Sequence, residues 1–117
     1  MGMPRDFIAT VQTKVAVAAV GQSVFRGQGP AGMQKMAQQF LRRLHLRRFA
    51  VHGESTFQAR LDVATAELLD AFPRSGRSWG AARKSLNLFL RDALHNLYLR
   101  SEFGLREIGR ASCRERV

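Results

Sequence analysis

The sequence predicts an all-α protein, a small bundle of about four helices built around one long central helix near 79–103. Three observations lead to this fold class. Apolar residues recur at steps of three and four in four separate segments. Short connectors containing proline or glycine separate these segments, and no segment is convincing as a strand. We therefore expect a single helical domain over 4–106.

The first predicted helix begins at Pro4, because the N–H group that proline lacks would be unpaired in a first turn anyway. It ends near Gly21. The β-branched run from Val15 to Val20 would also suit a strand, but Ala16 and Ala18 are strong helix formers and favour a helix. The apolar stripe of this helix consists of Phe7, Ile8, Val11, Val15, Ala18 and Ala19.

The second predicted helix covers 31–45, and the third runs from Ser55 or Thr56 to Phe72. Pro73 ends the third helix, since proline disfavours helical geometry in the residue before it. The C-terminal end of the second helix carries four arginines, and positive charge at that end complements the helix dipole. They are Arg42, Arg43, Arg47 and Arg48. Part of this cluster therefore needs no ligand to explain it.

The predicted central helix is apolar on two sides. Its main stripe consists of Trp79, Ala82, Leu86, Phe89, Leu90, Ala93, Leu94 and Leu97. Ser78 can cap its first turn, and Gly104 can close it in the left-handed conformation. Leu88 and Leu99 lie on the opposite face. This second apolar side predicts contact with a protein partner or with a second copy of the chain.

The chain is strongly basic, with 19 Lys and Arg against 9 Asp and Glu among 117 residues, a net charge of +10. Such a balance bears on partners rather than on fold, and nucleic acid, anionic lipid or an acidic protein would all match it. No apolar run approaches the roughly 18 residues of a membrane span. With Cys113 as its one cysteine, the chain has no disulfide framework. We expect a cytoplasmic protein without a membrane segment.

Residues 107–117 are expected to be a non-native tail. The segment from Ile108 to Val117 resembles the in-frame translation of a common short-read sequencing adapter, with every codon matched. The natural reading frame is then expected to continue beyond Arg106, so that the chain is C-terminally truncated. Residues 108–117 carry three arginines and one glutamate, so the net charge without them is +10 − 2, or +8. The alternative is a genuine basic C-terminus.

No catalytic or metal-binding pattern is evident. His45, His52 and His95 lie on three different segments, and the acidic residues show neither paired nor HExxH-like spacing. The sequence contains no GxSxG nucleophile motif. We therefore predict no cofactor and a binding module rather than an enzyme. An enzyme completed by residues beyond 106 is an alternative, with Arg83 and Asn87 at the edge of its pocket.

The strongest candidate site is basic. Arg74 and Arg77 lie in the turn before the central helix, Arg83 and Lys84 in its first two turns, and Arg91 farther along the polar edge from Lys84. A helix N-terminus adds free N–H groups and the positive end of the dipole. The arrangement predicts a phosphate-binding site, with nucleic acid as the partner.

Base recognition is not expected at this site. The third and central helices resemble a helix-turn-helix in outline, but Trp79, Ala82 and Leu86 are expected to face the core. Few positions are then left to read bases, so contacts should be to phosphates and sensitive to salt. The predicted function is a basic α-helical module that contacts nucleic-acid phosphates through the 74–91 region. A protein-interaction or structural helical module is the alternative.

The stretch WGAARKSLNLFLR, preceded by FPRSGRS, resembles a W-G-x-A-R-K-x-L-N-x-F-L-R motif of small bacterial proteins that carry no assigned activity. The resemblance covers about a fifth of the chain. It implies that Trp79, Arg83, Lys84, Asn87 and Arg91 belong to one recurring unit.

Overall fold

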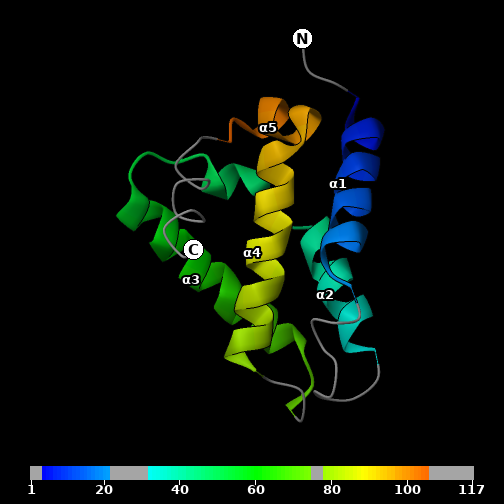
Figure 1. The fold of residues 1–117 in the computed structure, drawn as a ribbon, viewed down its shortest axis with the longest axis vertical. Helices are drawn as coiled ribbons and strands as arrows, with labels where there is room; N and C mark the ends of the chain where they lie inside the picture. The colour runs from blue at the N-terminus through cyan, green and yellow to red at the C-terminus, as the bar shows by residue number, and fades with distance from the viewer. Residues whose placement is uncertain (1–3, 22–31, 75–77, 106–117) are drawn as a thin grey trace.

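The computed structural model describes residues 4–21, 32–74 and 78–105, and every regular element in these ranges is helical. In chain order the elements are α1 (Arg5–Ala19), α2 (Met33–Arg42), the 3₁₀-helix η2 (Leu46–Phe49), α3 (Glu54–Ala71), α4 (Trp79–His95) and α5 (Leu97–Phe103). The predicted all-α fold class is confirmed (Figure 1). The expectations for Arg77 and for residues 107–117 fall outside the described residues.

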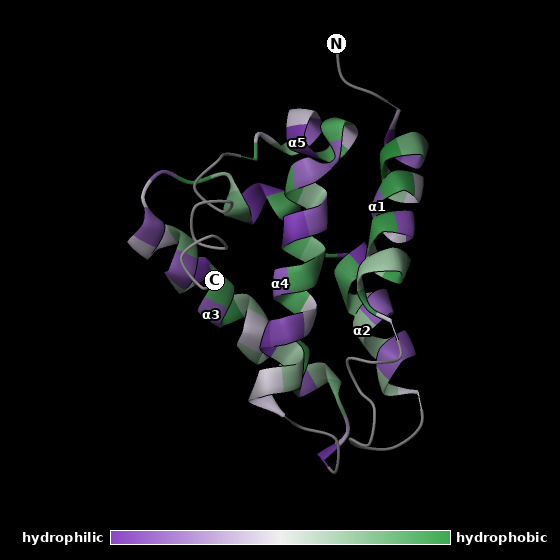
Figure 2. Cartoon of the chain, viewed as in Figure 1, coloured by the Kyte–Doolittle hydropathy of each residue, from purple (hydrophilic) through white to green (hydrophobic). Residues whose placement is uncertain are grey.

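Helix α4 lies at the centre of the bundle, with α1 on one side, α3 crossing on the other, and α5 at its C-terminal end (Figure 1). Hydrophobic and hydrophilic residues alternate along α4, as in a helix with one buried face (Figure 2). The buried face contains six members of the predicted stripe: Ala82, Leu86, Phe89, Leu90, Ala93 and Leu94. Each buried leucine or phenylalanine stabilises the fold by about 1.5–3 kcal/mol, so this face organises the core.

Helices α1 and α2 are joined through glutamines that bond the carbonyl groups at each other's C-terminal ends. Gln12 of α1 is buried, and its Nε2 donates to Leu41 O at 2.9 Å and to Leu44 O at 2.8 Å. In return, Gln38 Nε2 of α2 donates to Val20 O at 2.8 Å. The last carbonyls of a helix have no partner within it. The glutamine side chains donate to these carbonyl groups and so fix the position of α1 along α2.

The central helix is divided at Asn96, which differs from the single helix expected over 79–103. The backbone of Asn96 is extended, and its Oδ1 accepts a hydrogen bond from Leu99 N at 3.1 Å. An asparagine side chain competes in this way with the helical backbone for its N–H groups. The expected C-terminal closure is confirmed, because Gly104 adopts φ 65°. The result is a seven-residue α5 with its own cap.

The break at Asn96 overturns the outward placement of Leu99. Leu99 is fully buried, whereas Leu97 is 66% exposed. Leu88 is half-buried and packs against the core. Leu88 and Leu99 therefore do not form the exposed apolar surface that was predicted for a partner. The reason is that α5 begins anew after Asn96 and turns a different face toward the core.

Trp79 also differs from expectation. Its side chain is 47% exposed, although Ala82 and Leu86 on the same stripe are fully buried. Trp79 is the first residue of α4, at the end of the buried stripe, and about half of its surface is covered. An indole ring is left on the surface at the start of the basic region.

Candidate nucleic-acid interface

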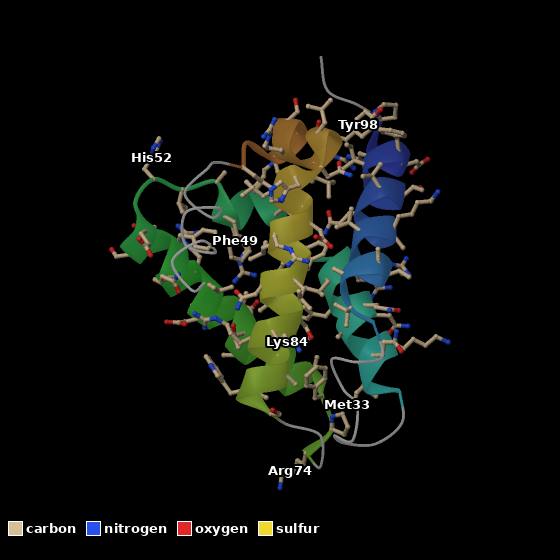
Figure 3. The ribbon with its side chains drawn as sticks, viewed as in Figure 1. Met33, Phe49, His52, Arg74, Lys84 and Tyr98 are labelled. Carbon is tan, nitrogen blue, oxygen red and sulfur yellow. The ribbon has the colours of Figure 1, made fainter. Side chains whose placement is uncertain are left out.

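The start of α4 is fixed by a local cap. Ser78 Oγ accepts a hydrogen bond from Ala81 N at 3.2 Å, which confirms its predicted role. Arg83 and Lys84 follow in the second turn, and Arg74 lies exposed just beyond the end of α3. Figure 3 shows Lys84 on α4 and Arg74 at the lower edge of the molecule.

Arg83 is held by α3. Its Nη1 lies 2.6 Å from Asp62 Oδ1, and its Nη2 donates to Gln58 Oε1 at 3.0 Å. The two acceptors occupy positions i and i+4 of α3, which lie on one face of a helix. Charge-assisted bonds of this kind are stronger than neutral ones. The geometry favours a structural role for Arg83 over the predicted phosphate contact.

Lys84 and Arg91 share the exposed face of α4. Lys84, Leu88, Arg91 and His95 follow one another at steps of four, three and four, which places them along one side of the helix. The structure gives Lys84 no ion-pair partner among the residues it describes. Arg91 contacts its neighbour Asp92 at 3.5 Å from Nε. That long contact is made by Nε and does not involve the Nη groups of Arg91.

A second basic region lies on other elements. Arg43, just after α2, and Arg48 of η2 border an open cavity of about 410 Å³, and Glu67 and Ala71 of α3 line its other side. Arg43, His45 and Arg48 line it, with Glu67 of α3. Arg48 Nη1 donates to Glu67 Oε1 at 2.9 Å. The sequence signal for this cavity was the arginine cluster at 42–48, which helix-dipole complementarity explained only in part.

The described residues offer neither a metal site nor a membrane span. No three of their His, Asp or Glu side chains are grouped closely enough to hold a metal ion. None of the described helices has the length and hydropathy needed to cross a membrane. No protein-family model, curated protein or solved structure matches this chain. A function for this chain is therefore inferred from its own residues.

Proposed function

We propose that this protein is a basic α-helical module that contacts nucleic-acid phosphates through the exposed face of α4. Lys84 and Arg91 make the central contacts, with Arg74 and Arg77 at the N-terminal end. Arg83 is reassigned from ligand contact to positioning. The observation that carries the proposal is Lys84, an exposed cation with no ion-pair partner in the described ranges, on the same face as Arg91.

The spacing of these two cations suits a phosphate backbone. Lys84 and Arg91 are seven residues apart, which is about 10 Å along a helix that rises about 1.5 Å per residue. One strand of B-form DNA carries a phosphate roughly every 3.4 Å of helix axis and also winds around that axis, so a separation of about 10 Å in space is covered by fewer than three phosphate steps. Both side chains can therefore approach one strand at the same time.

The surplus of positive charge supports the same function. Four acidic residues of the described ranges are in ion pairs with arginines: Glu102, Glu67, Asp62 and Asp92. Exposed cations such as Lys14, Lys35 and Lys84 have no such pair there. A positive field of this kind attracts a polyanion and speeds its association. Specificity for base sequence is not expected, since phosphate contacts carry none directly.

The test is a binding assay with matched charge variants. Fluorescence anisotropy of a labelled double-stranded oligonucleotide at low salt would compare Lys84→Gln/Arg91→Gln with Lys14→Gln/Lys35→Gln. Both pairs remove two positive charges from exposed positions. We expect the α4 pair to weaken binding more than about tenfold and the control pair less than about threefold. Equal losses would show that net charge alone drives binding and would contradict the proposed interface.

Self-association is the second candidate function, and an exposed aromatic pair favours it. The rings of Phe7 and Tyr98 meet edge to face with centroids 5.0 Å apart, although both side chains are exposed, and Leu97 adjoins Tyr98. A stable interface buries about 800 Å² per partner. The contact between two copies would therefore have to extend well beyond these three side chains. Light scattering that finds a monomer at all concentrations would exclude it.

A further inference from the structure

The cavity beside α2 combines a charged rim with an apolar floor. Arg43, His45 and Arg48 form the rim, and Phe40 and Leu44 line the interior. All its lining residues come from α2, η2, α3 and their connections. It is therefore independent of the α4 face and of the function proposed for that face.

The rim has more positive than negative charge. Arg43 is exposed and makes no ion pair within 4–21, 32–74 and 78–105. Arg48 is more covered, with its side chain 25% exposed, and one of its five N–H donors faces Glu67. Glu67 is 49% exposed, so water can solvate it if a ligand takes its place on Arg48. The rim thus holds two arginines and one carboxylate, and that carboxylate is bonded to Arg48 alone among them.

The floor can take an apolar group. Leu44 is buried and Phe40 half-buried, and the walls include Met36 and Ala71. Methionine adapts its shape to a ligand because its side chain is unbranched and polarisable. Sites for small molecules usually have apolar linings with a few polar groups and volumes of about 300–1,000 Å³. The 410 Å³ cavity falls at the small end of that range.

We propose that this cavity binds a small amphiphilic anion, with a carboxylate or phosphate-monoester head on a short apolar body. The guanidinium groups of Arg43 and Arg48 bind the head, since arginine donors match the geometry of these oxyanions. The imidazole of His45 adds a hydrogen bond at the rim. The apolar body lies against Phe40 and Leu44 and loses its contact with water.

Methionine methyl NMR tests this proposal directly. Met36 lines the cavity, whereas Met33 is buried at the start of α2 and serves as an internal control. Octanoate and octyl phosphate should give a saturable shift of the Met36 methyl signal and leave Met33 unchanged. Octanol should bind at least about tenfold more weakly, because it lacks the charge that the arginines recognise. Acetate and inorganic phosphate should give no saturable shift.

Three results would overturn the proposal. Equal binding of octanol and octanoate would mean that the arginines take no part. Equal binding of acetate and octanoate would mean that the apolar floor takes no part. A shift of Met33 as large as that of Met36 would mean that the anion acts on the whole bundle.

Variants separate the rim from the general charge of α2. Arg43→Gln should weaken octanoate binding about tenfold, whereas Arg42→Gln, an exposed neighbour outside the cavity, should leave it unchanged. Ala71→Leu adds bulk at an exposed edge of the cavity and should weaken binding of octanoate and octyl phosphate. Arg48→Gln should also weaken octanoate binding. If that variant does not fold, Arg43→Gln and Arg42→Gln still test the proposal, and equal effects of these two variants on octanoate binding would contradict it. Lys84→Gln/Arg91→Gln should retain octanoate binding.

Discussion

Arg83 Nη1 lies 2.6 Å from Asp62 Oδ1, and this ion pair connects the central helix α4 to α3. The adjacent Lys84 is turned about 100° around the helix and is exposed. Two neighbouring cations in one sequence motif thus have different environments. The pair gives Arg83 a role in the fold, whereas Lys84 has no ion pair in the part of the chain that the structure describes.

The Arg83–Asp62 pair should contribute modestly to stability. The Asp62 side chain is 60% exposed and that of Arg83 23%, so solvent screens much of their attraction. We expect a double-mutant cycle with Arg83→Ala and Asp62→Ala to give a coupling free energy of about 0.5–1 kcal/mol in urea denaturation. Lys84→Ala should change the free energy of unfolding by less than about 0.5 kcal/mol. A coupling of zero would remove the assigned structural role.

Gln12 should contribute to the free energy of unfolding, although it is a polar residue in a buried position. Gln12→Leu would leave the carbonyls of Leu41 and Leu44 without the donor that now lies 2.9 and 2.8 Å away. Leu41 O keeps the bond from Leu44 N at 3.2 Å, so Leu44 O is the carbonyl left unsatisfied, and we expect a loss of about 1–3 kcal/mol in the free energy of unfolding. Gln39→Leu, at an exposed position of α2, is the control. Similar losses for both variants would contradict the capping account.

Substitutions of Leu97 and Leu99 test whether the central helix is divided at Asn96. Leu99→Ala removes a fully buried side chain, and we expect it to lower the free energy of unfolding by about 2–5 kcal/mol. Leu97→Ala, at a 66% exposed position, should cost less than about 0.5 kcal/mol. An undivided helix, with Leu97 on the main stripe and Leu99 outside, would give the reverse order in thermal or urea denaturation.

The cap at Asn96 makes a separate prediction. Asn96→Ala removes the oxygen that accepts from Leu99 N and should destabilise the protein by about 1 kcal/mol. Asn96→Asp keeps an acceptor there and should retain most of the stability. Urea denaturation of both variants checks this, and identical losses would show that the side-chain bond does not stabilise α5.

Much of the fold could be predicted from the sequence because its signals are local. Ser78 and Gly104 mark helix ends through their own chemistry, and the three-and-four spacing identifies the buried face of α4. The division at Asn96 could not be predicted in this way. In the sequence, Leu97 continues the spacing of the α4 stripe and Leu99 falls on the opposite face, whereas in the structure α5 packs against α1 and α4 with Leu99 buried.

The candidate site was harder to predict than the fold. Which arginine meets Asp62 depends on how α3 crosses α4, and a single sequence holds no signal for that crossing. The cavity beside α2 likewise needs η2 and α3 to come together around the end of α2. The cations themselves were visible in the sequence, but their partners were not.

The measurement that most directly tests the central claim is the salt dependence of nucleic-acid binding by this chain. Each phosphate neutralised by a cation contributes about −0.9 to the slope of log K against log salt concentration. With contacts from Arg74, Arg77, Lys84 and Arg91, we predict a slope of about −3.6, and Lys84→Gln should make it shallower by about 0.9. Binding that is unaffected by salt, or a slope that Lys84→Gln leaves unchanged, would contradict phosphate contact through α4.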